Sequence, residues 1–321
     1  MLIEKSDQVS AEWLSGVLGE TVSHVEITST ASSWASHAGI VAATASGRAL
    51  RLWLKMCLGK TFGRSEVDFY TRDYVGLANA PLVPCFDACF VPGVGYHLLL
   101  TDLSERFRDR KIAEPTLEHG LAIAAALALM HQHHWETAAP PNESQWNRYF
   151  DQIRPGVLPL ERATDRSFRH RFELHTKELL NRWHDPQGMT LLHGDLNPTN
   201  VLTPKGAESP VYFLDRQPFE WSLTYGLAVY DLAYALVPWW PDTFRTLHEQ
   251  TILRHWFERL NQHGYSWDQA QRDWSLSVEQ CLHVPFEWCS DPETEVSMRP
   301  LWQWQLGNIT GILNYYEPHS P

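Results

Sequence analysis

Strand-like and helix-like segments are segregated along this chain of 321 residues, and the change falls close to Asp102. Before it, short apolar runs are separated by Gly and Pro, as in antiparallel strands joined by turns. After it, most apolar residues recur at helical spacing, and 116–136 is long and nearly continuously apolar. The chain therefore predicts an α+β fold with a small antiparallel β lobe at 1–101 and a larger α-helical lobe at 102–321.

The same patterns predict individual elements in each lobe. In the first lobe we expect a helix at 10–18, strands at 22–30, 40–45 and 49–57, a loop at 31–39, a helix at 65–79, and a hairpin at 85–91 and 96–101. In the second lobe we expect helices at 116–136, 145–154 and 167–184, a short strand pair at 200–203 and 211–214, and helices from 225 onward.

The segment most suggestive of chemistry is HGDLNPTN at residues 193–200. It places Asp195 five residues before Asn200, and Asp215 follows fifteen residues later at the end of an expected strand. One carboxylate can orient a hydroxyl and take its proton, while amide and carboxylate oxygens suit magnesium. Gly, Asp, Asn and Pro are also ordinary turn residues, so the segment alone is compatible with a simple turn.

HGDLNPTN followed by Leu214-Asp215 resembles the catalytic and metal-binding segments of the aminoglycoside phosphotransferase/choline kinase family, relatives of the protein kinases. LLLTDL at 98–103, LALMHQHHW at 127–135 and GLAVYDLA at 226–233 resemble three further segments in family order. The resemblance implies a protein-kinase-like fold, Asp195 as the catalytic residue, and Asn200 and Asp215 as magnesium ligands. It also implies ATP or GTP as phosphate donor.

Lys55 lies in RLWLKMC, an otherwise apolar strand, where an unpaired ammonium would be costly. Glu66, eleven residues later, is its natural partner, although Asp68 lies close in sequence. The resemblance implies that Lys55 contacts the nucleotide phosphates and that Glu66 fixes it. An edge-strand lysine facing solvent is the alternative.

The resemblance also suggests where the rest of the nucleotide binds. No GxGxxG is present, but Ser33 and Ser36 lie in the Ser-rich segment between the first two strands, where backbone N–H groups could meet phosphates. An ordinary hairpin loop is equally compatible with this segment. Leu100, Thr101 and Leu103 fall in the segment that resembles the family's hinge, which implies backbone contacts with the adenine.

Three further residue groups receive structural interpretations. Asp231 is expected to hold the 193–195 loop by hydrogen bonds. His131, His133 and His134 are spaced i, i+2, i+3, which splits them across helix faces, so packing is favoured over a metal site. Arg216 next to Asp215 departs from the family pattern and could contact phosphate or pair with an acid.

The charge and the cysteine content indicate which binding partners and which cellular compartment to expect. The formal net charge is −12, of which −10 falls in residues 102–321, so nucleic acid is not an expected partner. Five Cys without a CxxC pair, no signal-peptide pattern and no long apolar span predict a cytoplasmic protein without membrane attachment. The oligomeric state is left open.

The acceptor is expected to be a small hydroxylated molecule, such as an aminoglycoside-like antibiotic or an amino alcohol. A cationic acceptor fits the acids that gather near the C-terminus, and a neutral one fits the Trp residues there; core Trp and solvated acids are the plainer interpretation. These residues are Glu279, Glu287, Asp291, Glu293 and Glu295, with Trp267, Trp274, Trp288, Trp302 and Trp304.

Two other functions remain open at this point. A protein kinase is disfavoured because Tyr225 follows Asp215 by only ten positions, which is short for an activation segment. A nucleotide-binding pseudokinase or scaffold is disfavoured because Lys55, Asp195, Asn200 and Asp215 are intact. The function that we expect is a small-molecule O-phosphotransferase.

Overall fold

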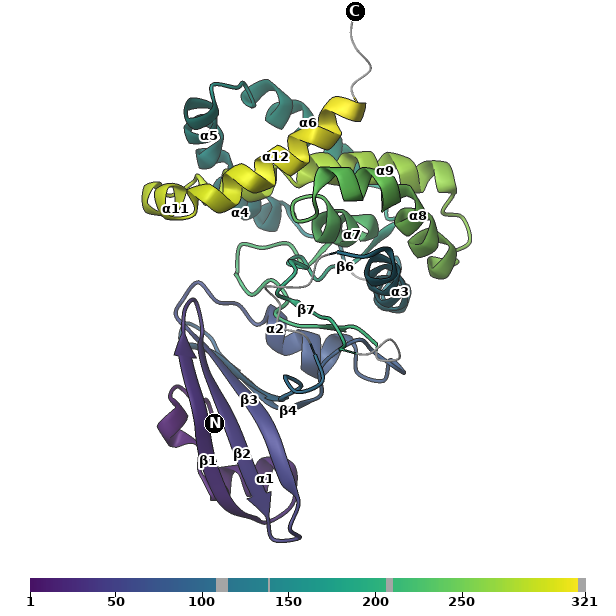
Figure 1. Ribbon diagram of the computed structural model, residues 1–321. Coiled ribbons are helices and arrows are strands. Elements are labelled where there is room, and N and C mark those ends of the chain that lie inside the picture. Colours follow the sequence, from purple (N-terminus) through teal and green to yellow (C-terminus); the bar gives the residue numbers. More distant parts are fainter. Residues whose placement is uncertain (108–114, 138, 206–209, 317–321) are drawn as a thin grey trace, which may run out of the picture. The chain divides into compact units, whose positions relative to one another are not determined.

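The first of two compact units is built on a five-stranded antiparallel sheet with the order β1-β2-β3-β5-β4 (Figure 1). The computed structural model describes residues 1–107, 115–137, 139–205 and 210–316. This unit combines Met1–Ile112 with a returning segment, Leu202–Glu220. Its elements are a 3-10 turn (Ser6–Gln8), α1 (Ala11–Leu18), β1 (Val22–Ser32), β2 (Ser36–Thr44), β3 (Ala49–Leu58), α2 (Ser65–Asp68), a π-helical turn (Phe69–Asp73), β4 (Cys85–Val91), β5 (Gly95–Thr101) and β8 (Tyr212–Phe213).

Alternation along β3 gives the sheet two different faces. Leu52, Leu54 and Met56 join a core cluster that includes residues of α1. Cys57 joins the cluster on the opposite face, together with Val67 of α2 and Leu214 of the returning segment. Lys55 is two residues from Cys57 along the strand, so its side chain lies on the same face of the sheet, the face that α2 and the returning segment cover.

Two expectations for this unit were wrong in detail. Residues 31–39 are not all loop, because the β1–β2 ladder continues through Ala31↔His37 and Ser32↔Ser36 and leaves a turn of three residues. Small polar side chains do not prevent backbone pairing, since the ladder uses only main-chain groups. The helix expected at 65–79 ends at Asp73, and Gly76 and Asn79 adopt positive φ values of 86° and 57°, which a continuing helix cannot accommodate.

The second unit is Ala113–Val201 with Trp221–Pro321, and its described residues form helices apart from short strands. The α+β class expected from the sequence is therefore confirmed. Helix α5 was not anticipated. The elements are α3 (Leu117–His133), α4 (Glu143–Ile153), a 3-10 turn (Arg154–Gly156), α5 (Val157–Thr164), α6 (Arg169–Trp183), β6 (Met189–Leu191), β7 (Val201–Leu202, which crosses the unit boundary), β9 (Tyr225–Leu227), α7 (Ala228–Leu236), α8 (Asp242–Leu260), α9 (Trp267–Gln280), α10 (His283–Trp288), α11 (Pro292–Ser297) and α12 (Arg299–Tyr316).

Helix α7 lies at the centre of this unit, since all nine of its residues are buried. The strand β6 pairs antiparallel with β9, directly before α7, from Met189↔Leu227 to Leu191↔Tyr225. The segment that follows β6 is therefore held next to the start of α7. Among the described residues, no helix is both long enough and apolar enough to cross a lipid bilayer.

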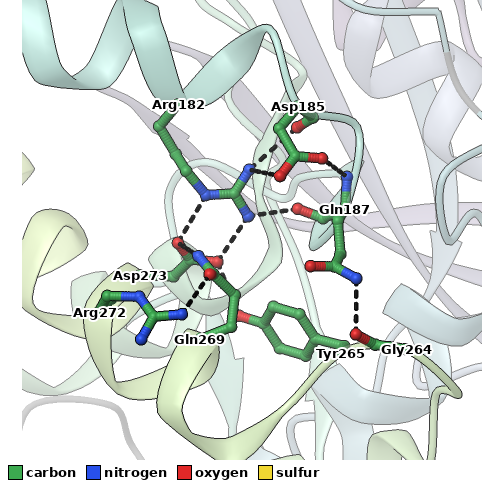
Figure 2. A network of polar contacts seen from close by, with 8 residues as sticks. All are labelled: Arg182, Asp185, Gln187, Gly264, Tyr265, Gln269, Arg272 and Asp273. Carbon is green, nitrogen blue, oxygen red and sulfur yellow. Dashed lines mark hydrogen bonds and ion pairs between the residues drawn. The ribbon is translucent and has the colours of Figure 1, made fainter.

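A polar network anchors the residues that lead into β6 (Figure 2). The guanidinium of Arg182 donates to both carboxylate oxygens of Asp273, at 2.7 and 2.8 Å, and also to the backbone carbonyl of Gln187. Tyr265 donates its hydroxyl to the same carboxylate at 2.9 Å. Gly188, with a φ of 80°, is packed so closely on this network that a Cβ there would lie 2.8 Å from the Tyr265 ring.

Candidate active site

The loop that carries Asp195 is fixed through its backbone by one buried carboxylate. Asp231 of α7 accepts hydrogen bonds from the N–H groups of His193 at 2.8 Å and Gly194 at 2.9 Å. Gly194 has a φ of 78°, a conformation that glycine adopts without strain. The structural role expected for Asp231 is confirmed by these two bonds.

Asp231 is in turn held by His131 of α3. The indole N–H of Trp256 donates to His131 Nδ1 at 3.1 Å, so the ring proton lies on Nε2, which donates to Asp231 at 3.3 Å. Burial by itself raises the pKa of Asp231, but hydrogen bonding to His131 and the loop N–H groups lowers it below the ordinary value. The packing interpretation of His131 is confirmed.

The carboxylate of Asp195 is oriented by three side-chain donors. Its Oδ1 accepts from Asn197 Nδ2 at 3.0 Å and from the hydroxyl of Tyr234 at 2.8 Å. Its Oδ2 accepts from Asn200 Nδ2 at 3.1 Å. A carboxylate held at both oxygens cannot rotate freely, which suits a group that must present one oxygen to a substrate hydroxyl.

The amide of Asn200 has a defined orientation. Its Nδ2 donates to the backbone carbonyl of Asp195 at 2.8 Å as well as to the Asp195 carboxylate. Because the nitrogen is hydrogen-bonded to Asp195, the oxygen Oδ1 faces away from that residue. Oδ1 accepts a hydrogen bond from Thr199 Oγ1 at 3.3 Å. Asn200 therefore presents a hard oxygen of the kind that magnesium binds.

In the first unit, Lys55 forms a buried ion pair with Glu66. The distances from Lys55 Nζ to the two Glu66 oxygens are 2.9 and 2.8 Å, and Tyr96 donates its hydroxyl to the same carboxylate. Glu66 is fully buried and Lys55 is nearly so. The pairing expected from the sequence is confirmed, and Lys55 does not face solvent.

Asp215 completes this charged group. Its Oδ1 lies 3.1 Å from Lys55 Nζ, and its own φ is 56°. Burial alone lowers the pKa of Lys55, but the charges of Asp215 and Glu66 outweigh burial and raise that pKa well above its usual range. Lys55 is therefore a permanent cation beside two carboxylates.

Arg216 serves the structure of this segment. Its guanidinium donates to Asp73 at 2.5 Å, lies 5.6 Å from the centre of the Phe69 ring, and is almost completely buried. Burial alone raises the pKa of Asp73, but Arg216 lowers it below the ordinary value. Of the two roles left open for Arg216, pairing with an acid is the one observed.

The remaining residues expected to bind nucleotide lie at the β1–β2 turn, at the end of β5 and just after that strand. The turn is narrow, with Ser33 N–H donating to the Ala35 carbonyl at 2.9 Å and Ser36 starting β2. Thr101 N–H already donates to the Pro84 carbonyl at 2.9 Å. The N–H of Leu103 has no hydrogen-bond partner among the described residues, and Leu100 packs in the adjoining core cluster.

The acids near the C-terminus divide by environment. Glu279 lies 3.0 Å from Arg171, Glu295 pairs with Arg299 at 2.6 Å, and Asp291 caps α11. Glu293 is exposed. Glu287 of α10 differs, because its burial and the charge of Asp195 raise its pKa to about 7.

Two of the five Trp residues of the same region belong to the core, whereas Trp267 and Trp288 are half-buried and Trp304 is exposed. Trp274 and Trp302 are buried, and Trp302 donates its indole N–H to the Glu295 carbonyl at 2.9 Å. Trp267 lies under the guanidinium of Arg254, 3.7 Å from its ring centre. Trp304 is 44% exposed and stands 6.2 Å from Trp239, measured between ring centres.

The structure brings the sequence-predicted residues together in two groups: Lys55, Glu66 and Asp215 in the first unit, and Asp195 with Asn200 in the second. Sequence reasoning missed Tyr234 and gave Asn197 no role. Tyr234 follows Asp231 by three residues, so the helical spacing could have indicated a shared face. Within the described ranges, no three His, Cys, Asp or Glu side chains form a metal-binding group of their own.

The sequence model of the phosphotransferase enzyme family matches residues 98–270. A search of curated proteins found no match.

Among similar solved structures, a candidate fructosamine-3-kinase from Thermobifida fusca has a TM-score of 0.54 at 15% identity, covering 94% of this chain and 100% of that chain. A macrolide 2′-phosphotransferase from Brachybacterium faecium has a TM-score of 0.49 at 14% identity, with 96% and 98% covered. An aminoglycoside-3′-phosphotransferase of type VIII has a TM-score of 0.47 at 18% identity, with 80% and 93% covered. At 15% identity the likeness to the first of these structures concerns the fold alone, and the fold class expected from the sequence is confirmed. Because the family match covers more than half of the sequence, this chain belongs to the phosphotransferase enzyme family.

Proposed function

We propose that this chain transfers the γ-phosphate of ATP or GTP to a hydroxyl group of a small molecule. The observation that carries the proposal is the carboxylate of Asp195, which three side-chain donors orient within a loop that Asp231 fixes. Phosphoryl transfer depends mainly on alignment and charge stabilisation, so an oriented carboxylate is the principal group that the protein must supply.

In this reaction Asp195 accepts the proton of the acceptor hydroxyl. The hydroxyl oxygen forms a bond to the γ-phosphorus while the bond from that phosphorus to the bridging oxygen breaks, and the nucleoside diphosphate leaves. Lys55 supplies a fixed positive charge to the donor phosphates. Glu66 keeps the Lys55 side chain in place, and the raised pKa of Lys55 keeps it charged.

The residues present fit magnesium. Asn200 directs an amide oxygen away from Asp195, and Asp215 carries a carboxylate; each is a ligand type that magnesium takes beside phosphate and water. Bound magnesium would neutralise phosphate charge. Asp215 also contacts Lys55. In this proposal Lys55 binds the phosphates and Asp215 binds the metal, so the two side chains hold each other in position.

For the nucleotide base, we propose that the N–H of Leu103 is the principal donor. Thr101 N–H is engaged with Pro84, whereas Leu103 N–H has no partner among the described residues. Leu100 would border the base through its side chain. Backbone N–H groups near Ser33 and Ser36 would approach the phosphates.

We propose a cationic acceptor, and Glu287 is the reason. Four of the five acids near the C-terminus are paired, serve as a helix cap or lie exposed, whereas Glu287 is close enough to Asp195 for the two charges to interact. A half-buried carboxyl group with a pKa of about 7 gains stability as an anion when an ammonium group binds beside it. An amine near the reacting hydroxyl would satisfy this requirement.

The direct test is transfer of label from γ-labelled ATP and GTP to a panel of hydroxylated compounds, with and without amines. We expect a phosphorylated product that depends on magnesium, and Asp195→Asn should lower turnover by about a hundredfold or more while leaving nucleotide binding intact. Asp151→Asn, at an exposed acid of α4, is the matched control. Nucleotide binding without any transfer would instead identify a pseudokinase, and transfer only to protein would identify a protein kinase.

A further inference from the structure

We propose that Tyr234 is a positioning residue for the catalytic carboxylate and that it ties the side chain of Asp195 to helix α7. The inference rests on the proposed role of Asp195 in phosphoryl transfer. It goes beyond that proposal because Tyr234 lies outside the segments that resemble the family's motifs.

The contact is direct and comes from outside the catalytic loop. Tyr234 donates its hydroxyl to Asp195 Oδ1 at 2.8 Å. The donors Asn197 and Asn200 belong to the same loop as Asp195 and move with it. Tyr234 belongs to a fully buried helix, so its bond fixes the carboxylate relative to the core of the unit.

Helix α7 therefore holds the catalytic loop at two levels. Asp231, three residues earlier, accepts the backbone N–H groups of His193 and Gly194. Residues three apart lie on the same face of a helix, so one face fixes the loop backbone through Asp231 and the reacting side chain through Tyr234. This arrangement restricts both the position and the rotation of Asp195.

The ring of Tyr234 is itself immobilised. It meets Trp239 edge to face at 6.1 Å between ring centres and packs at 6.0 Å against Tyr230. Only 7% of Tyr234 is exposed. A tyrosine packed in this way has little rotational freedom, so its hydroxyl is a fixed reference point.

The direction of the hydrogen bond is also fixed. Burial first, and then the charge of Asp195, raise the pKa of Tyr234 well above its ordinary value, so the phenol keeps its proton throughout the pH range of enzyme assays. Tyr234 is therefore always the donor and Asp195 always the acceptor. The bond persists when the acceptor hydroxyl arrives.

The test compares Tyr234→Phe with Tyr230→Phe, a substitution on the same helix at a tyrosine that is also 7% exposed and that, among the described residues, forms no hydrogen bond with Asp195. Removal of the hydroxyl at 234 should lower kcat about tenfold, leave the KM for nucleotide unchanged, and keep the unfolding midpoint close to that of the control. The control should stay within about twofold of the wild type. Equal kcat values for the two variants would overturn the inference.

Crystal structures of both variants give a readout that does not require activity. In Tyr234→Phe the Asp195 side chain should occupy a second rotamer, and in Tyr230→Phe it should keep the original one. An unchanged Asp195 rotamer in Tyr234→Phe overturns the positioning role even if no acceptor is phosphorylated. Absence of transfer by the wild type, together with a displaced rotamer in the variant, would remove the proposed function and leave the positioning role in place.

Discussion

At the scale of single residues, Asp215 combines an unusual backbone conformation with a contact to Lys55. Its φ of 56° is one that Asn tolerates well, so Asp215→Asn removes the charge with little backbone strain. With nucleotide present, magnesium should raise the unfolding temperature of the wild type. We expect Asp215→Asn to require about tenfold more magnesium than the wild type for the same rise. Asn200→Ala should have a smaller effect of the same sign.

Thermal unfolding over a magnesium titration measures this directly, with Glu26→Gln at an exposed site on β1 as the control. If both variants respond to magnesium as the wild type does, the metal is held by other residues. Asp215→Asn should also loosen Lys55, because one of its two carboxylate partners becomes neutral.

Glu287 makes a pH-dependent contribution to stability. Its pKa rises from 4.5 to about 7 on folding, so between these values the folded chain binds more protons than the unfolded chain. The free energy of unfolding contributed by Glu287 is therefore fully present below about pH 4.5 and is lost as the pH rises through about 7. Glu287→Gln should stabilise the protein above this window, by about 3 kcal/mol at most.

Urea denaturation at several pH values would show this as a smaller loss of stability between pH 5 and pH 8 in Glu287→Gln than in the wild type. Glu293→Gln, at an exposed carboxylate, should leave the pH profile unchanged. A profile for Glu287→Gln that parallels the wild type would mean that Glu287 has no raised pKa. A cationic acceptor should bind more tightly as the pH rises and Glu287 loses its proton.

At the scale of elements, the Arg182–Asp273 network secures the entry to β6 and thereby the segment that continues to Asp195 (Figure 2). Asp273 is almost completely buried, and removing one partner of a buried ion pair leaves an uncompensated charge. Asp273→Ala should therefore lower the free energy of unfolding by roughly 3–5 kcal/mol. Urea denaturation of the variant measures the loss.

The matched control is Glu295→Ala, which breaks the more exposed ion pair with Arg299 and should cost less than about 1 kcal/mol. Similar losses for both variants would show that burial does not set the strength of the Arg182–Asp273 pair. If Asp273→Ala stays folded, it should also lower kcat, because Gly188 and β6 lose their support.

Element prediction succeeded where one signal dominated. Ser10 caps α1 as expected, its side chain accepting from the Trp13 N–H, and the hairpin of β4 and β5 forms around Pro92 and Gly93. The helix expected at 65–79 was overextended, because apolar spacing does not report the positive φ values at Gly76 and Asn79. Helix α5 was missed because its eight residues carry a short periodic signal.

At the scale of the whole molecule, the formal net charge of −12 predicts that the rate of binding of a cationic acceptor depends on salt. Exposed acids attract a cationic acceptor over distances that salt shortens, to about 8 Å at physiological ionic strength. We expect kcat/KM for a cationic acceptor to fall as salt is raised from about 0.05 to 0.3 M, while kcat holds.

Steady-state kinetics at several salt concentrations tests this, and a neutral hydroxylated acceptor serves as the control with a flat response. If cationic and neutral acceptors respond alike, electrostatic steering is absent. The charge of residues 102–321 would then be only a solvated surface.

The sequence by itself indicated the fold class, the family resemblance and the candidate site residues Lys55, Asp195, Asn200 and Asp215, because these predictions depend on residue type and on spacing along the chain. Only the tertiary structure decided which side chains support them. Tyr234 lies 39 positions from Asp195, and Glu287 is 92 positions from it, yet each interacts with its carboxylate. The role of Arg216 depended in the same way on Asp73, 143 positions away. These contacts form because segments far apart in the sequence pack together, and local sequence patterns do not predict which distant segments will pack.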